Sequence, residues 1–280
     1  MEKYNLRIIK AKQMIGDADF IIIGAGSGLS SAAGLEYSGE SFETNFKDFI
    51  KKYNFTDLYS ASFYDFKTQE EKWAFFAKMI EVNRYNKTPL KLYEELYKIA
   101  KDKNYFILST NVDGQFYNSG FDENKIFEVQ GDYGYLQCEN ACHNKLYDNK
   151  ELVHKWIENT KDCKIPYELV MKCPVCGGNM DMNLRKDANF VQDEKWYVQA
   201  ERYKEFLKEA ENKNVVLLEI GVGFNTPGII RYPFEQMVKA NDKIRLIRIN
   251  KDYPMPMLDI RYKTVSFDEN ANKVIEDLEE

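Results

Sequence analysis

The chain has 280 residues, of which 39 are lysine or arginine and 45 are aspartate or glutamate, so its formal net charge is −6. With 44% hydrophobic residues, this length can bury the core of one large domain with a small insertion, and the composition excludes disordered, collagen-like and coiled-coil proteins. The acidic balance, without a dense basic stretch, argues against a nucleic-acid partner.

No segment has the apolar length of a membrane span. The best apolar run covers only residues 20–23, and the first ten residues lack the apolar core of a signal peptide. We therefore expect a cytoplasmic protein that does not associate with a membrane.

Taken in chain order, helical periodicity alternates with short β-branched runs. Residues 4–16 predict a helix, and residues 20–23 predict a buried strand that ends at glycines. Residues 36–66, rich in Tyr, Phe and Ser, predict a loop with short helices. Further helices are expected at 71–86, 89–102, 200–212, 228–241 and 270–278, and further strands at 105–109, 125–129, 215–220, 244–249 and 264–267.

This alternation predicts an α/β fold with a doubly wound parallel sheet. Residues 131–190 interrupt it and hold all five cysteines, so they predict a small inserted module. We expect residues 1–130 and 191–280 to form the sheet domain, with residues 36–88 as a helical and loop part of its ligand cleft.

A glycine loop, residues 24–28, follows the first predicted strand. Such a turn lets backbone N–H groups and a helix N-terminus approach a pyrophosphate. The strict G-x-G-x-x-G pattern fails, because Leu29 stands at its last position. A glycine-rich turn without a ligand remains the alternative for this loop taken alone.

Four cysteines form two close pairs about thirty residues apart, a spacing that predicts tetrahedral zinc bound by thiolates. Four protein ligands leave no open coordination position, so the zinc is expected to be structural. His143 is an alternative ligand, and Cys163 is expected to be a small buried or surface thiol. The predicted ligands are Cys138, Cys142, Cys173 and Cys176.

Several segments together resemble the motifs of the sirtuin family, in the family's order and over residues 20 to 250. The matching segments are Gly24-Ala25-Gly26 with residues 29–35 (GAG-I-S-x-x-S-G-I), residues 109–114 with Gly120 (T-Q-N-I-D-G…G), residues 127–131 (E-x-H-G), residues 221–223 (G-T-S) and residues 249–250 (I-N). This resemblance implies a Rossmann-like NAD-binding domain with an inserted zinc-ribbon-like module. The NAD-binding residues that it implies are Gly24, Ala25, Gly26, Ser30, Thr110, Asn111, Asp113, Gln130, Gly221, Gly223 and Asn250.

The chain departs from the family at two informative places. Tyr37-Ser38-Gly39 stands where the family has D-F-R, and Gln130 replaces the histidine of E-x-H-G. The chain's two histidines, His143 and His154, both fall in the predicted zinc module. This combination resembles the macrodomain-linked class M sirtuins, which implies protein mono-ADP-ribosylation in place of deacylation.

The resemblance implies four catalytic residues. Asp113 would bind the nicotinamide carboxamide, and Asn111 the adjacent ribose or an attacking group. Gln130 cannot act as a base, but its amide can hold ribose hydroxyls. Arg185 would orient an acidic acceptor or the pyrophosphate. Alternatives remain for residues 111–114, which are typical of a turn, and for Arg185, which a solvated surface would also suit.

We therefore expect NAD-dependent transfer of ADP-ribose to a protein. The resemblance implies a lipoyl-carrier protein of the glycine-cleavage type as acceptor and a macrodomain hydrolase as partner. Two alternatives stay open: a protein-lysine deacylase that works without histidine, and a non-catalytic sensor of NAD or ADP-ribose.

Overall fold

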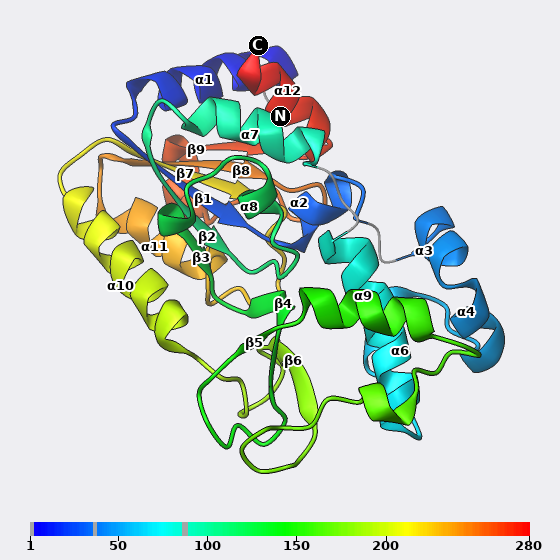
Figure 1. Cartoon of the computed structure of the whole chain (residues 1–280). Helices are drawn as coiled ribbons and strands as arrows, with labels where there is room; N and C mark the ends of the chain where they lie inside the picture. Colours follow the sequence, from blue (N-terminus) through cyan, green and yellow to red (C-terminus); the bar gives the residue numbers. More distant parts are fainter. Residues whose placement is uncertain (1–2, 36–37, 86–88) are drawn as a thin grey trace. The chain divides into compact units, whose positions relative to one another are not determined.

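The computed structural model describes residues 3–35, 38–85 and 89–280 (Figure 1). Its contacts divide the chain into two compact units. The first, here called the sheet unit, comprises Met1–Ala33, Pro89–Gln130 and Glu194–Glu280. The second, here called the cysteine unit, comprises Gly34–Thr88 and Gly131–Asp193. Tyr37, which replaces part of the family's D-F-R, lies outside the described residues.

The sheet unit is built on a six-stranded sheet in which every neighbouring pair is parallel. The strand order is β3-β2-β1-β7-β8-β9, so the direction of winding reverses between β1 and β7. This confirms the predicted doubly wound fold. The strands are β1 (Phe20–Ala25), β2 (Asn104–Ser109), β3 (Ile126–Glu128), β7 (Val215–Ile220), β8 (Ile244–Ile249) and β9 (Thr264–Phe267).

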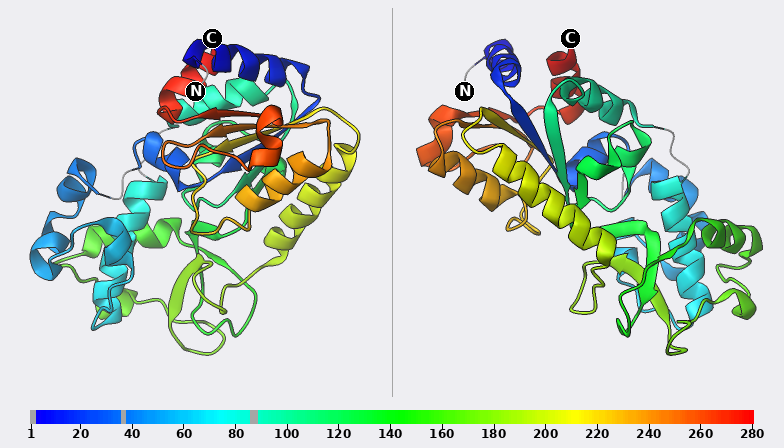
Figure 2. Two further views of the ribbon diagram at one scale, coloured as in Figure 1. Left: turned by 180° about the vertical axis from the view of Figure 1, so that it is seen from behind. Right: turned by 60° about the vertical axis from the view of Figure 1, so that its left-hand side comes forward.

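Helices cover both faces of this sheet (Figures 1 and 2). One face packs against α1 (Tyr4–Asp17), α7 (Lys91–Ala100) and α12 (Ala271–Glu279), and the other against α10 (Glu194–Glu209) and α11 (Arg231–Ala240). The short helices α2 (Ser27–Ala32) and α8 (Gln115–Asn118) follow β1 and β2, and 3₁₀ turns lie at Glu123–Lys125 and Leu258–Lys263.

The sequence of β1 explains its central place. All six of its residues are buried, and alternate side chains enter the two cores, Ile21 and Ile23 on one face and Ile22 on the other. Gly24 lets α11 pack closely, because a Cβ there would lie 2.6 Å from Ile230 Cγ2.

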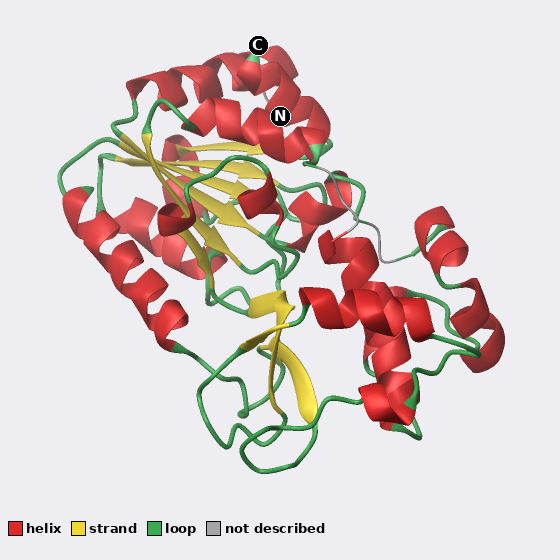
Figure 3. Ribbon diagram, in the orientation of Figure 1, coloured by secondary structure: helices red, strands yellow, loops and turns green. Residues whose placement is uncertain are grey.

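The cysteine unit combines a three-stranded antiparallel sheet, in the order β5-β4-β6, with helices (Figure 3). Its strands are β4 (Gly131–Cys138), β5 (Tyr147–Asp148) and β6 (Met180–Leu184). Its helical segments are α3 (Glu40–Asn45), α4 (Lys47–Tyr53), α5 (Leu58–Ser62), α6 (Gln69–Ile80), a π-helical turn Glu81–Tyr85, α9 (Lys150–Asn159) and a 3₁₀ turn Tyr167–Leu169.

Residues 34–88 group with residues 131–193, whereas residues 36–88 were expected to belong to the sheet domain. Trp73 of α6 and Trp156 of α9 are both fully buried and stack with ring centroids 4.8 Å apart. Around Phe75, further rings from α3 to α6 form an aromatic core, with Phe46 at 5.7 Å and Phe55 at 5.4 Å. These large apolar surfaces draw α6 to α9, whereas the sequence order had suggested the preceding sheet domain.

Two helices begin at residues other than the expected ones, because residues that favour a helix start outweigh the hydrophobic periodicity. Helix α6 begins at Gln69, two residues before the expected start, because the Thr68 hydroxyl accepts the Glu71 N–H at 3.3 Å. Helix α11 begins at Arg231 and has Pro233 in its first turn, where the missing N–H is tolerated. Among the helices of the described residues, none has the length and apolar character needed to cross a bilayer.

Candidate NAD site and zinc centre

The loops that follow β1 and β7 meet at the switch point of the sheet, the position where doubly wound folds bind ligands. A Cβ on Gly26 would lie 2.6 Å from the Gly221 carbonyl oxygen, and one on Gly221 would lie 2.3 Å from Leu29 N. Gly221 also has a φ of +63°. The Gly26 N–H already donates to Ile220 O at 3.0 Å, so these glycines allow backbone to pack directly on backbone.

A chain of four buried polar side chains lies behind these loops. Asn111 Nδ2 donates to Gly26 O at 3.1 Å and is also hydrogen-bonded to the Tyr93 hydroxyl. That hydroxyl lies 3.1 Å from Ser30 Oγ, which donates to Asp113 Oδ2 at 2.5 Å. We call Asn111, Tyr93, Ser30 and Asp113 the polar chain.

The donors of the polar chain have a fixed direction. An amide nitrogen only donates and a carboxylate only accepts, so the protons point from Asn111 through Tyr93 and Ser30 to Asp113. Burial, followed by the charge of Asp113, raises the pKa of Tyr93 well above its ordinary value, so its phenol stays protonated and can donate. The amide of Asn111 is thereby held with its nitrogen inward.

The turn after β2 is held in place by the backbone. Asp113 Oδ1 accepts the Gln115 N–H at 3.1 Å. The N–H and hydroxyl of Thr110 both donate to Ala25 O, at 2.9 and 3.1 Å. The structure thus brings Ser30, Asn111 and Asp113 together, while Thr110 joins the ends of β1 and β2.

Gln130 lies two residues beyond β3, and its Nε2 donates to Thr226 Oγ1 at 2.9 Å. Strands β3 and β7 are separated by β2 and β1, so the loop after β7 must reach across the carboxyl ends of those two strands. Both histidines of the chain belong to the cysteine unit, where His154 Nε2 lies 3.6 Å from Glu81 Oε2.

The remaining predicted residues of the sheet unit lie on the loops after β7 and β8. Asn250 Nδ2 donates to Val222 O at 2.8 Å, and its Oδ1 accepts the N–H groups of Asp252 and Tyr253. Gly223 borders open space, since a Cβ there would meet nothing within 4 Å.

Arg185 is exposed and directly follows β6 of the cysteine unit. Asn111, Asp113 and Gln130 therefore all belong to the sheet unit, and Arg185 belongs to the other unit. The roles of these four residues in catalysis stay predictions.

Two features of the sheet unit were not predicted from the sequence. Tyr93 gave no signal, because a tyrosine on an apolar helix face reads as ordinary core. Glu219 and Arg248 are register partners in adjacent buried strands. Opposite charges within two otherwise apolar runs were a usable signal for a buried ion pair.

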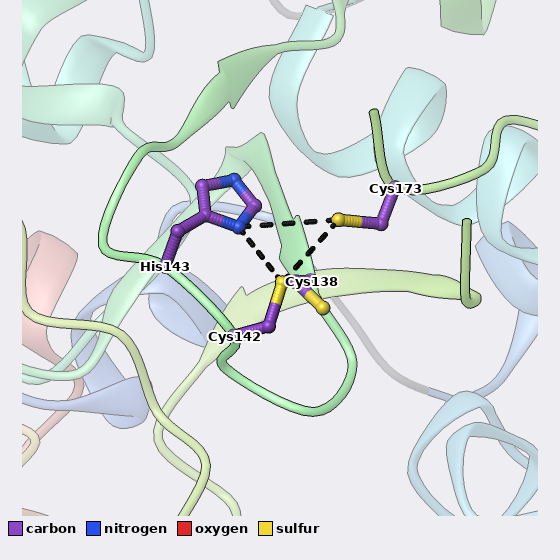
Figure 4. Close-up of side chains that lie close together, drawn as sticks. All are labelled: Cys138, Cys142, His143 and Cys173. Carbon is purple, nitrogen blue, oxygen red and sulfur yellow. Dashed lines mark hydrogen bonds between the residues drawn. The ribbon is translucent and has the colours of Figure 1, made fainter. Parts of the chain in front are cut away.

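The cysteine unit gathers four thiols (Figure 4 shows three of them with His143). Cys138 Sγ lies 3.7 Å from Cys176 Sγ, and Cys142 Sγ lies 3.6 Å from Cys173 Sγ. Tetrahedral zinc, with Zn–S bonds of about 2.3 Å, holds its sulfur ligands roughly 3.8 Å apart, so the spacing fits this ion.

His143 supplies a fifth donor atom beside the thiols (Figure 4). Its Nδ1 lies 3.1 Å from Cys142 Sγ and 3.9 Å from Cys173 Sγ, and its Nε2 lies 3.0 Å from the Tyr147 hydroxyl. Cys163 is a buried free thiol, as expected for the cysteine left outside the predicted ligand set.

Curated relatives cover most of the chain. A protein ADP-ribosyltransferase of Staphylococcus aureus is 35% identical over 263 residues, which make up 93% of this chain and 83% of that protein. A probable bifunctional ADP-ribose hydrolase/ADP-ribosyltransferase of Fusarium oxysporum f. sp. cubense is 33% identical over 253 residues. That match covers 85% of this chain but only 41% of the fungal protein, so the chain spans less than half of that relative.

Solved structures share the fold. A complex of a Sir2 homologue with NAD has a TM-score of 0.62 at 15% identity, covering 97% of this chain and 92% of that one. A mutant Sir2 homologue in complex with ADP-ribose has a TM-score of 0.59 at 14% identity, covering 96% and 94%. No protein-family model matches the chain. The chain belongs to the family of the staphylococcal protein ADP-ribosyltransferase, and its fold is that of the Sir2 proteins, the sirtuins.

Proposed function

We propose that the chain is an NAD-dependent protein mono-ADP-ribosyltransferase of the sirtuin type. The observation that carries the proposal is Gln130, which follows β3 where the sirtuin motif has histidine, while both histidines lie in the cysteine unit. The names of the two curated relatives support the same activity.

In the proposed reaction, an acceptor nucleophile forms a bond to C1′ of the NAD ribose while the bond from C1′ to nicotinamide breaks. Nicotinamide leaves as a neutral molecule, and the acceptor's proton goes to solvent. Asn111 would contact the ribose or the acceptor through the oxygen of its amide, since Gly26 O and the Tyr93 hydroxyl occupy the nitrogen. Asp113 would bind the nicotinamide carboxamide.

Deacylation needs a further step, in which a base removes a proton from a ribose hydroxyl. A histidine near neutral pKa suits that step, and a glutamine amide has no basic lone pair for it. Gln130 would instead hydrogen-bond the ribose hydroxyls and hold the sugar. The proposed site therefore supports the first half-reaction and lacks the base for the second.

Arg185 and the thiol cluster complete the proposal. Arg185 would orient an acidic acceptor or the pyrophosphate, since a guanidinium binds planar anions through two parallel bonds. The four thiolates would hold a structural zinc that maintains the cysteine unit. Thiolate ligands for zinc suit a reducing, cytoplasmic location.

The acceptor and partner are proposed more specifically. By resemblance to the class M sirtuins, the acceptor is a lipoyl-carrier protein of the glycine-cleavage type. The fungal relative is named as both hydrolase and transferase, which supports a macrodomain hydrolase as the partner that removes the modification.

Nicotinamide release from NAD tests the role of the polar chain in this activity. We expect Asn111→Ala to lower the rate by about a hundredfold, because a polar contact to the reacting centre is lost. Asn272→Ala is the matched control: Asn272 Nδ2 also donates to a backbone carbonyl of the sheet unit, Ala32 O. Equal rates in the wild type and Asn111→Ala would refute the assignment.

A further inference from the structure

Four charged side chains are buried together beneath the loops after β7 and β8. Glu219 and Arg248 are fully buried, and Arg231 and Glu235 are 3% and 4% exposed. Arg248 Nη2 donates to Glu219 Oε2 at 2.9 Å and its Nη1 to Glu235 Oε1 at 2.8 Å. Arg231 Nη1 lies 3.5 Å from Glu219 Oε1. Two positive and two negative charges are thus paired inside the protein.

Stability alone is a poor reason for this arrangement. Taking charges out of water costs free energy that their mutual attraction often fails to offset, and apolar side chains would fill the same volume at no such cost. Burial raises the pKa of Glu219, and the charge of Arg248 opposes that shift. The backbone groups that the two guanidinium groups bind are therefore a better indication of their role than the ion pairs are.

Arg231 binds backbone carbonyls of two separate loops. Its Nη1 lies 3.4 Å from Val222 O in the loop after β7, and its Nη2 lies 3.1 Å from Tyr253 O and 3.2 Å from Met255 O in the loop after β8. Arg248 Nη1 adds a contact to Met255 O at 3.2 Å. One planar group thereby fixes the spacing of two loops that border the switch point.

One half-exposed aromatic ring lies on this guanidinium, and a second one packs against the first. Arg231 Cζ lies 4.5 Å from the centroid of the Phe224 ring, and Phe224 meets Tyr253 edge to face at 5.0 Å. Phe224 is 48% exposed and Tyr253 is 49% exposed. Rings held in fixed orientation at the end of a sheet suit a planar base, which stacks on aromatic faces.

We infer that Arg231 is a positioning residue for the adenosine half of NAD. It holds the loops after β7 and β8, and with them the Phe224 and Tyr253 rings, at the spacing that this half of the ligand requires. The inference rests on the proposed function, in which Asn111 and Asp113 on the β2 side take the nicotinamide half. The β7 and β8 loops lie across the switch point from them.

Arg231→Lys tests the inference, because lysine keeps the charge but cannot reach three carbonyls with one planar group. The variant should fold, since Arg248 still pairs with Glu219 and Glu235. We expect its Kd for AMP and for ADP-ribose, measured by calorimetry, and its KM for NAD to rise at least about tenfold. Its kcat for nicotinamide release should stay within about twofold, because the loops act on binding in the ground and transition states alike.

Arg7→Lys is the matched control. Arg7 is also a buried arginine of the sheet unit that donates to a backbone carbonyl, Ser266 O at 2.8 Å, and pairs with Asp268 and Glu269. A purely structural role of Arg231 would lower kcat through loss of folded enzyme and leave the AMP affinity of the folded fraction unchanged. The control should change neither affinity nor kcat.

The outcomes separate this inference from the proposed function. If the wild type binds ADP-ribose, and Arg231→Lys binds AMP as tightly as the wild type does, the inference is overturned and the proposed function stands. If the wild type binds neither AMP nor ADP-ribose, the proposed function fails and takes the inference with it. If Arg231→Lys cannot be purified, Phe224→Leu decides instead: it alters only an exposed ring on the guanidinium, and an unchanged AMP affinity would overturn the inference.

Discussion

At the scale of single residues, hydrogen-bond direction determines which atoms the site presents. Asn111 has two donors and one carbonyl oxygen on its side chain, and the donors are occupied by the Gly26 carbonyl and the Tyr93 hydroxyl. Tyr93 is decisive here, because it receives from Asn111 and donates to Ser30. Its ring packs edge to face on Phe116 at 4.9 Å, so its position does not depend on the hydroxyl.

Tyr93→Phe should therefore impair the reaction without disturbing the core. We expect the kcat for nicotinamide release to fall about tenfold, the equivalent of one buried hydrogen bond of roughly 1.4 kcal/mol. In the Asn111→Ala background the same change should have almost no further effect, because Tyr93 acts through Asn111.

Tyr105→Phe is the control for that prediction. Tyr105 is a buried tyrosine of the same core, and its hydroxyl accepts the Asp122 N–H at 3.0 Å. Its loss should lower the free energy of unfolding by about 1 kcal/mol and leave kcat unchanged. Additive effects of Tyr93→Phe and Asn111→Ala would contradict the proposed route through Asn111.

At the scale of elements, the structure has no room for a side chain at one glycine, Gly26, and has room for one at another, Gly16. Gly26 faces the loop after β7, whereas a Cβ on Gly16 in α1 would meet nothing within 4 Å. We expect Gly26→Ala to lower the free energy of unfolding by about 2 kcal/mol, because the two loops must separate. Gly16→Ala should raise it by about 0.5 kcal/mol, through helix propensity. Urea denaturation measures both, and equal effects would refute the close approach of the loops.

The thiol cluster leads to a prediction about bound metal: replacing one of its predicted ligands should remove the zinc. Cys176→Ser should lose the zinc and lower the melting temperature, because folding of the cysteine unit is coupled to metal binding. Cys163→Ser, which changes a buried thiol of the same unit outside the predicted ligand set, should keep one zinc per chain. Elemental analysis of the purified variants gives the metal content.

His143→Ala distinguishes the two ligand sets that the geometry offers. With four thiolates as ligands, the variant keeps its zinc. Zinc loss in His143→Ala together with full zinc in Cys176→Ser would show that three cysteines and a histidine bind the metal.

Strands were more predictable than the packing of helices. Residues 215–220 and 244–249 are mostly apolar runs rich in β-branched side chains, and both strands were confirmed at their expected limits. Residues 36–66 were correctly expected to hold short helices, but periodicity does not say which neighbour a helix meets. The stacking of Trp73 on Trp156, residues 83 positions apart in sequence, is a tertiary preference.

The sequence predicted which segments form the site, but it did not predict the hydrogen bonds between their side chains. The order of motifs led to Ser30, Asn111 and Asp113, which the structure joins through hydrogen bonds. Tyr93 and Arg231 lie on helices whose sequence patterns also fit plain cores, so only the fold reveals their partners.

At the scale of the whole molecule, the chain combines a sheet unit that carries the predicted NAD residues with a cysteine unit that carries the predicted zinc ligands. Both belong to the segment shared with the curated transferases, which covers 93% of the chain in the staphylococcal match. We propose that the chain transfers ADP-ribose to a protein and does not deacylate lysine.

A single competition reaction distinguishes ADP-ribose transfer from deacylation. The chain is incubated with NAD, a lipoylated carrier protein of the glycine-cleavage type and an acetyl-lysine peptide, and the masses of both substrates are measured. We expect a carrier protein heavier by one ADP-ribosyl group and an unchanged peptide. A deacetylated peptide beside an unmodified carrier would contradict this proposal.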